Sequence, residues 1–429
     1  MTTRKNFLFL FIAFFALTSA LKAQDTIRQM HYNLMQYSIY PYGDCTSTNN
    51  SLDKKDSLLK IILNHANPDI ITVNEITNTQ AHVDRILQNV LNTEGVNYWK
   101  SGQLTSLSGG TLANMIYYDS RKLTMHSYYI VQTSVRDINI YKMYFNTPQL
   151  ADGDTIFYIP IIAHLKAGTS DTEERLTMIQ SLMSRLNNWG ISDNYVLSGD
   201  FNIYTSSEPA YQQLLNYSNS AVRFYDPIDT PGDWNNSYSY RHVHTQSTHT
   251  SGDCFATGGL DDRFDFILVS AQILNGYDHV KAISETYTAL GQDGNHYNSS
   301  IISPSNTAIP QDIANALYNM SDHLPVMMDF LVYYPQAGIN SVNNQLNIST
   351  VNPFSNQIIL KIQNPENDDF NYMISNIEGK ILKQGEFLHY NLNSEFQIET
   401  SDFQRGIYIL KIYSKDKSAT LKLIKIVQE

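Results

Sequence analysis

The chain has 429 residues, of which 42% are hydrophobic and 12% aromatic, so a largely disordered protein is excluded and two or three domains are possible. Its net charge is −12, and residues 24–335 carry 17 Lys and Arg against 31 Asp and Glu. Proteins that hold nucleic acid mainly through bulk charge are basic, so this class is excluded. A polyanionic substrate would need a bound cation and a few placed Arg, Lys and His residues.

Residues 1–23 have the pattern of a secretory signal peptide. The stretch "MTTRKNFLFLFIAFFALTSALKAQ" combines two basic residues, an apolar run from about Phe7 to Ala20, and small residues that end at Ala23. The apolar run is too short to cross a bilayer, and no later segment approaches the required length. We therefore expect a monomer without a stable membrane span, exported through the periplasm and then secreted or held at the cell surface.

Residues 24–335 alternate strand-like runs with helical periodicity. Segments Asp56–Ala66 and Glu173–Gly190 place apolar residues at i, i+3, i+4 and i+7, as helices that cover a sheet do. Mixed strands and helices predict a layered α/β domain. Thr205–Gly259 is rich in Ser, Thr, Asn, Gly and Tyr, and its second half is expected to be a long functional loop. The candidate strands are Pro68–Ile76, Asn114–Asp119, Tyr158–Lys166, Asn194–Ile203, Arg263–Ser270 and Leu324–Tyr334.

Residues 336–429 consist of short alternating runs separated by Asn-, Gly- and Ser-rich turns, which predict a small all-β sandwich. The motifs "NPF" at Asn352–Phe354, "GK" at Gly379–Lys380 and "GIYILKI" at Gly406–Ile412 resemble the C-terminal sorting domain of Bacteroidetes type IX secretion cargo. The resemblance implies the type IX secretion machinery as a partner, and a domain that is removed after export or anchors the protein at the surface. A generic adhesive β-module is the alternative.

Polar residues stand at the ends of the predicted strands. In an extended strand alternate side chains share a face, so Asp200 and Asn202 are expected to point into one cleft, and Gly199 to allow close approach to a phosphate. Each residue alone also fits a turn, a cap or a core position, but their order and contexts jointly favour a cation and phosphate site. They are Asn33 in "MHYNLM", Glu75 in "TVNEI", His164 in "IAHLK", Asp200 and Asn202 in "SGDFNI", Asp265 in "RFDFILVS", and Asp322 and His323 in "MSDHLPV".

From about Arg28 to Tyr334, these motifs resemble the endonuclease/exonuclease/phosphatase superfamily, with "GDFN" and "SDHLPV" as the most specific. The resemblance implies an α/β fold, a four-layer αββα sandwich with two mixed β-sheets, followed here by the small all-β domain. It also implies an active site at one end of the sheets that hydrolyses phosphoester bonds.

The resemblance implies metal ligation by Asn33, Glu75 and Asp322. Oxygen donors suit Mg²⁺, with Mn²⁺ or Ca²⁺ as alternatives. Many related nucleases carry an acid two residues after the Asn, but this chain has Met35 there, so metal binding is expected to depend more heavily on Glu75.

The resemblance also assigns roles around the phosphate. Either His323, held by Asp265, or Asp200 activates the attacking water, and the sequence does not choose between them. His164 and Asn202 would donate hydrogen bonds to the phosphate oxygens. Arg136 in "TSVRDINIY" is predicted to contact the substrate, with a surface ion pair as the alternative.

Two features stay open at the level of sequence. Cys45 and Cys254 could form one disulfide in an exported protein, but nothing gives their distance. The histidines His242, His244 and His249 have a spacing that a transition metal could use, yet exposed or substrate-facing side chains are the favoured interpretation because no acidic or Cys partner is in register.

The leading prediction is a secreted, metal-dependent phosphodiesterase, an extracellular endonuclease with nucleic acid as its substrate. The alternatives within the superfamily are a sphingomyelinase or phospholipase C-like enzyme and a phosphomonoesterase. The alternative outside enzymes is a surface-displayed binding protein with a decayed core. Hydrolysis that a chelator abolishes separates the enzymes from the binding protein.

Overall fold

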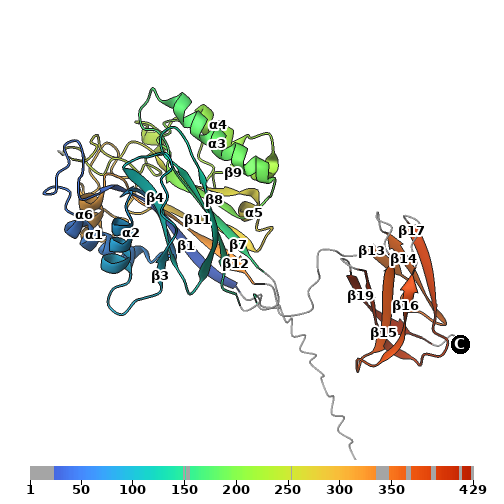
Figure 1. Ribbon diagram of the computed structural model, residues 1–429. Coiled ribbons are helices and arrows are strands. Elements are labelled where there is room, and N and C mark those ends of the chain that lie inside the picture. The colour runs from blue at the N-terminus through green and yellow to red at the C-terminus, as the bar shows by residue number, and fades with distance from the viewer. Residues whose placement is uncertain are drawn as a thin grey trace, which may run out of the picture. The chain divides into compact units, whose positions relative to one another are not determined.

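The computed structural model describes residues 24–147, 150, 155–252, 254–334, 347–363, 369–387, 393–414 and 418–426. The predicted signal peptide at 1–23 lies outside these residues. The chain divides into two compact units, Met1–Gln336 and Ala337–Glu429 (Figure 1). Within the described residues, no helix combines the length and apolar character needed to cross a membrane.

The first unit contains two six-stranded sheets. The pairs β1–β2 and β7–β8 are parallel and the other pairs are antiparallel, so both sheets are mixed. One sheet has the order β11-β12-β1-β2-β4-β3, with β1 Gln24–Tyr37, β2 Ile70–Thr77, β3 Trp99–Ser101, β4 Leu112–Asp119, β11 Val280–Ala289 and β12 Val326–Tyr333. The other has the order β5-β6-β7-β8-β10-β9, with β5 Leu123–Val131, β6 Ile138–Phe145, β7 Phe157–His164, β8 Tyr195–Asp200, β9 Phe224–Tyr225 and β10 Asp265–Ser270.

Helices cover the outer faces of the two sheets. In Figure 1, α1, α2 and α6 lie on one side of the sheets, and α3 and α4 lie on the opposite side. The predicted four-layer αββα sandwich is thereby confirmed. The helices are α1 Leu52–Ala66, α2 Gln80–Ile86, which continues as a π-helix over Leu87–Leu91, α3 Thr172–Trp189, α4 Pro209–Leu215, α5 Ala271–Asn275 and α6 Gln311–Met320.

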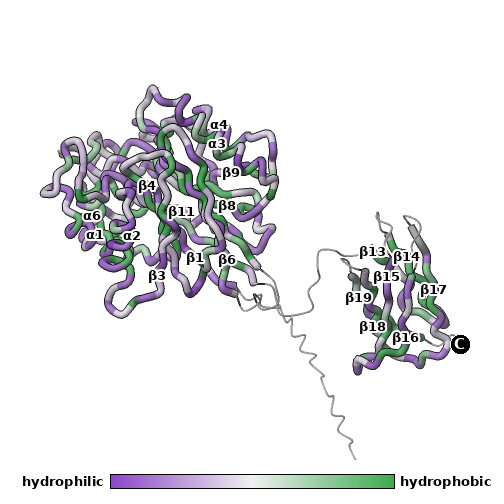
Figure 2. Tube along the Cα trace, viewed as in Figure 1, coloured by the Kyte–Doolittle hydropathy of each residue, from purple (hydrophilic) through white to green (hydrophobic). Residues whose placement is uncertain are grey.

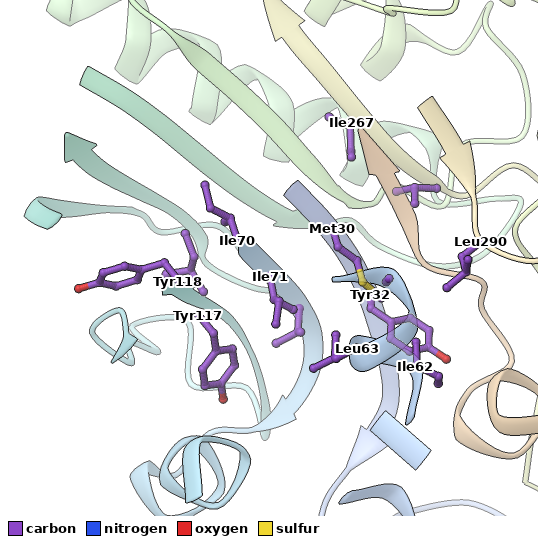
Figure 3. Close-up of a cluster of buried hydrophobic side chains, with 14 of the residues drawn as sticks. Met30, Tyr32, Ile62, Leu63, Ile70, Ile71, Tyr117, Tyr118, Ile267 and Leu290 are labelled. Carbon is purple, nitrogen blue, oxygen red and sulfur yellow. The ribbon is translucent and has the colours of Figure 1, made fainter. Parts of the chain in front are cut away.

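The core explains this layering. Central strands buried on both faces are nearly continuous apolar runs, as Figure 2 shows for the middle of the first unit. Figure 3 shows Met30 and Tyr32 of β1 near Ile62 and Leu63 of α1, all buried. The predicted helix at Glu173–Gly190 is α3, which ends where Gly190 takes a left-handed φ of 63°.

Several elements differ from the sequence-based expectation. Strands β1, β5, β6 and β11 were not among the candidate strands; β5 and β11 are edge strands with many partly exposed residues, so their apolar signal is weak. The segment Thr205–Gly259 contains α4 and β9 in its first half, whereas its second half is mostly irregular, as expected.

The second unit is all β, as predicted. Its apolar core includes Ile358, Leu360, Leu410 and Ile412. Its sheets have the orders β13-β14-β17 and β16-β15-β18-β19, with β13 Asn347–Thr350, β14 Gln357–Gln363, β15 Phe370–Asn376, β16 Ile381–Phe387, β17 Asn393–Glu399, β18 Gly406–Tyr413 and β19 Ser418–Lys425.

Candidate active site

Sheet topology gathers the predicted site residues at one edge of the sandwich. Asn33 lies opposite Asn74 in the parallel pair β1–β2, and His164 lies opposite Asp200 in the parallel pair β7–β8. Strand β10 runs antiparallel to β8, so its first residue, Asp265, lies opposite the last residue of β8. Residues far apart in the sequence therefore share one edge.

Two carboxylates lie at the centre of this edge. The amide nitrogen of Asn33 is 3.2 Å from Glu75 Oε1 and 3.0 Å from Asp200 Oδ2. His164 Nε2 lies 3.5 Å from Asp200 Oδ2 and 3.8 Å from Glu75 Oε1. One ligand atom from each of Glu75, His164 and Asp200 falls within 4.8 Å of the others, which is close enough for a shared cation.

The electrostatics of the cluster favour a cation. Burial, opposed by the charge of His323 and assisted by the charges of Asp265 and Glu75, raises the pKa of Asp200 to about 7. Burial, with Arg136 adding to it, holds the pKa of His164 well below its usual range, so its imidazole is neutral and able to ligate. Two carboxylates and a neutral imidazole fit a divalent metal ion, whereas Asn33 donates its amide N–H to the carboxylates and accepts the Met35 N–H through Oδ1, so its metal ligation stays a prediction.

His323 and Asp265 form a buried pair beside this cluster. His323 Nδ1 lies 2.7 Å from Asp265 Oδ2, and His323 Nε2 lies 3.7 Å from Asp200 Oδ2. Burial alone would lower the pKa of His323, but Asp265 and Asp200 outweigh it and raise that pKa well above its usual value. The other oxygen of Asp265 faces His31 Nε2 at 3.9 Å.

The "SGDFNIY" stretch differs from its predicted geometry. Strand β8 ends at Asp200, and Asn202 has a left-handed φ of 51°. Its backbone N–H donates to Asp200 Oδ1, and its side-chain amide lies 3.4 Å from the carbonyl oxygen of Leu165. The expectation that strand alternation orients both side chains was therefore wrong. A Cβ on Gly199 would lie 1.8 Å from Ala163 O, so the glycine permits close packing of β7 and β8.

Unusual backbone conformations accompany the site. Met35, Gln36 and Glu75 have φ values of 45°, 51° and 60°, although left-handed conformations are costly for residues other than glycine. The turn at Met35 and Gln36 lets the Gln36 N–H donate to Glu75 Oε2 at 2.9 Å. The strained turn and the hydrogen bond that it allows direct the Glu75 carboxylate toward the cluster.

The two remaining predicted site residues, Asp322 and Arg136, make contacts of their own. Asp322 Oδ2 accepts hydrogen bonds from the Ala256 N–H at 3.0 Å and the Gln246 amide at 3.3 Å, so the structure does not bring it into the Glu75–His164–Asp200 group. Its metal ligation stays a prediction. Arg136 is partly buried, donates to the carbonyl oxygen of Leu165, and lies close enough to lower the pKa of His164.

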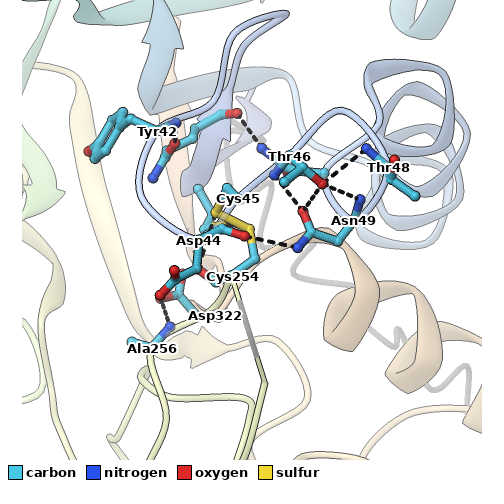
Figure 4. Close-up of a disulfide and its surroundings, with 12 residues drawn as sticks. Tyr42, Asp44, Cys45, Thr46, Thr48, Asn49, Cys254, Ala256 and Asp322 are labelled. Atoms are coloured by element: carbon cyan, nitrogen blue, oxygen red, sulfur yellow. Dashed lines mark hydrogen bonds between the residues drawn. A yellow bond between two sulfur atoms is a disulfide. The ribbon is translucent and has the colours of Figure 1, made fainter.

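The two cysteines form a disulfide, which resolves the alternative left open by the sequence. The Cys45 and Cys254 sulfurs are bonded, and the bridge joins positions 209 residues apart (Figure 4). Figure 4 also shows Asp322 and Ala256 close to the bridge, joined by their hydrogen bond. The disulfide therefore fastens the loop that contacts Asp322 to the segment after β1.

The three loop histidines do not converge in the described part of the chain. His244 is buried, with Nε2 2.9 Å from the carbonyl oxygen of Trp234. His249 is buried between the rings of Phe255 and Tyr318. His242 is exposed. The expected solvent exposure is thus confirmed for His242 and wrong for the two buried histidines.

Sequence reasoning missed two polar residues of the site. Asn74 accepts a hydrogen bond from the Asp200 N–H at 2.9 Å, and its position directly before Glu75 in "VNEI" was an available signal. The amide nitrogen of Gln246 lies 2.7 Å from His323 Nε2. Gln246 belongs to an irregular polar loop and had no signal of its own.

Comparison with known proteins identifies the C-terminal part. Residues 352–426 match the family model described as the secretion system C-terminal sorting domain. The second unit is a sorting domain. Its presence indicates export and a secreted or cell-surface location, and it confirms the resemblance seen in the sequence. No curated protein matches the chain.

Solved structures are similar to the first unit. One is the human Nocturnin catalytic domain, 14% identical, covering 72% of this chain and 97% of that one, with a TM-score of 0.45. Another is an endonuclease/exonuclease/phosphatase family protein from Bacteroides thetaiotaomicron, 12% identical, covering 73% and 100%, with a TM-score of 0.46. A third is D. rerio TDP2 in complex with a single-stranded DNA product, 15% identical, covering 71% and 98%, with a TM-score of 0.43.

Proposed function

We propose that the first unit is a divalent-metal-dependent hydrolase of phosphoester bonds, and that it acts as an extracellular endonuclease. The observation that supports this most directly is the meeting of two carboxylates, Glu75 and Asp200, with the buried His323–Asp265 pair 3.7 Å away. Metal ligands beside an oriented imidazole are the parts that phosphoester hydrolysis requires.

The metal ligands in this proposal are Glu75, Asn33 and His164, which leaves Asp200 free for the attacking water. A divalent ion held there would neutralise charge on the phosphate and on the departing oxygen. The Asn202 amide and the Arg136 guanidinium would bind the non-bridging phosphate oxygens, where preorganised donors stabilise the transition state.

In this proposal, the attacking water is activated by a group of three residues, Asp200, His323 and Asp265. Asp265 fixes the ring orientation of His323 and leaves Nε2 facing Asp200. A pKa of about 7 keeps Asp200 near the value at which a general base works best at neutral pH, whereas the raised pKa of His323 favours a proton donor or a phosphate contact. We therefore favour Asp200 as the base, so Asp200→Asn should remove the acidic limb of the pH profile of activity, and a His323 variant should remove the basic limb.

Aromatic residues at the rim support nucleic acid as the substrate. Tyr42 is 55% exposed, and its pKa is raised by burial and by the nearby charge of Glu75. Its N–H donates to Gln36 Oε1, and Gln36 in turn donates to Glu75. Tyr40, two residues earlier, is 87% exposed. Exposed tyrosines fixed beside a phosphate site are suited to stack on bases.

The test is a substrate panel with the exported full chain. Duplex DNA, single-stranded DNA, RNA, sphingomyelin and a phosphomonoester are each incubated with Mg²⁺, with Mn²⁺ and with a chelator. We expect metal-dependent cleavage within nucleic acid strands, lost in His323→Ala and retained in His126→Ala, a matched change of an exposed histidine on β5.

Two outcomes would contradict the proposal at different levels. Turnover of sphingomyelin or the monoester alone would keep the hydrolase and reject nucleic acid. Absence of turnover on every substrate, or turnover that the chelator does not affect, would reject the metal-dependent hydrolase itself and favour a binding protein.

A further inference from the structure

A lysine ammonium is buried behind the candidate active site. Lys55, on α1, is 2% exposed, and its Nζ lies 2.6 Å from Leu34 O, 2.6 Å from Met35 O and 2.9 Å from Met320 O. An ammonium has three hydrogens to donate, and three carbonyl oxygens accept them. Lysine is almost never fully buried unless it is partnered, so this side chain needs an explanation.

The three carbonyls belong to two segments that carry site residues. Leu34 and Met35 directly follow Asn33, and Met320 ends α6 immediately before Ser321, Asp322 and His323. Ser321 completes the connection: its hydroxyl donates to Asn33 O at 2.7 Å and accepts from the His323 N–H at 3.1 Å. The ammonium thus joins a metal-ligand segment to the segment of the catalytic histidine.

The backbone at Leu34 and Met35 has a conformation that directs carbonyl oxygens toward the Lys55 ammonium. Two successive carbonyls, from Leu34 and Met35, converge on one nitrogen, and Met35 has a left-handed φ of 45°. Burial lowers the pKa of Lys55, but the negative charges of Asp322 and Glu75 oppose that shift, and three carbonyl acceptors match the three N–H groups of the charged form.

If residue 55 served only to pack α1 against the core, burying an apolar side chain there would cost less free energy than burying a charged one. The neighbours Leu59 and Ile62 on the buried face of α1 are apolar. A buried charge costs free energy unless its surroundings compensate it, and removing it would leave three carbonyl oxygens unpaired. The arrangement resembles the coordination of a metal ion by backbone carbonyls.

We propose that Lys55 is a positioning residue whose ammonium takes the place of a structural cation. It holds the turn after Asn33 and the segment before His323 in register, so that the metal ligands and the water-activating group face the same phosphate. The inference rests on the proposed function for its catalytic consequence, and on the geometry alone for its effect on the metal site.

The test compares Lys55→Met, which keeps the side-chain length without the charge, with Lys54→Met on the exposed neighbour. Circular dichroism checks folding, calorimetry measures Mn²⁺ affinity, and steady-state kinetics separate kcat from KM. Because a 1 Å misplacement of catalytic groups can cost about 10²-fold, we expect kcat to fall by about 10- to 100-fold in Lys55→Met with KM nearly unchanged. Mn²⁺ binding should weaken, and Lys54→Met should match the wild type.

Rescue tests the charge itself. In Lys55→Ala, added ethylammonium should restore Mn²⁺ affinity and kcat, whereas tetramethylammonium, which has no N–H donor, should not. A folded Lys55→Met with wild-type kcat and Mn²⁺ affinity overturns the inference. If neither variant folds with or without ethylammonium, Lys55 is a stability residue and the inference is also overturned.

The two proposals fail in distinguishable ways. If the wild type binds Mn²⁺ but hydrolyses no phosphoester, the proposed function fails, while the Mn²⁺ affinities of Lys55→Met and Lys54→Met still decide the role of Lys55.

Discussion

The first unit and the sorting domain bury polar side chains to very different extents. Within the described residues of the sorting domain, the buried polar side chains are Thr400 and Lys425, and Lys425 donates to the carbonyl oxygen of Thr400. The first unit buries a lysine on three carbonyls and brings several acids and histidines to one edge. A buried charge thus occurs in both units, but among the described residues only the first unit gathers several of them at one edge, as groups with perturbed pKa values do at functional sites.

The largest expected effect concerns the His323–Asp265 pair. Asp265→Asn should lower kcat by about 10²–10⁴-fold, because the ring of His323 loses its oriented partner. Adding His323→Ala should lower kcat little further, since the two residues act as a unit. Steady-state kinetics of the two single variants and the double variant measure this. Fully additive losses would show that the residues act independently.

Removal of the disulfide should destabilise the first unit alone. Both cysteines of the chain lie in this unit, and their bridge closes a separation of 209 residues. Cys45→Ser with Cys254→Ser should lower the free energy of unfolding of the first unit by up to about 5 kcal/mol. Denaturant titration under non-reducing conditions checks this. An equal loss in the sorting domain would mean that the two units unfold together.

A core substitution in the sorting domain should leave catalysis unchanged. Leu410 of β18 is fully buried, and Leu410→Ala should lower the free energy of unfolding of that domain by about 3 kcal/mol. We expect kcat and Mn²⁺ affinity within the error of the wild type, together with less protein exported. A tenfold change in kcat would contradict the separation of roles between the units.

The smallest effect is a pH dependence confined to the first unit. Burial lowers the pKa of His249 to about 4, below the value near 6.5 of an unfolded chain. The folded state therefore resists protonation, and its stability falls as the pH drops from 6.5 to 4. His249→Phe should reduce the slope of stability against pH by up to about 1.4 kcal/mol per pH unit. Thermal melts of both proteins from pH 4 to pH 7 measure it, and identical slopes would exclude the buried histidine as the cause.

The sequence by itself determined features that depend on local patterns. Helix α3 shows its apolar periodicity over 18 residues, and the motifs around Asp200 and His323 can be read without knowing where the strands lie. The three motifs of the sorting domain can likewise be recognised from short stretches of sequence alone. Strand ends are local features of a sequence, so the candidate residues were found one by one.

Only the tertiary structure decided which residues meet. The order of strands in the two sheets brings Asp265 beside Asp200. The packing of the chain also places the ammonium of Lys55 against three carbonyl oxygens from remote segments and brings Cys45 to Cys254. Such contacts depend on distances between residues separated by tens or hundreds of positions. Chain packing sets those distances, and no local pattern encodes them.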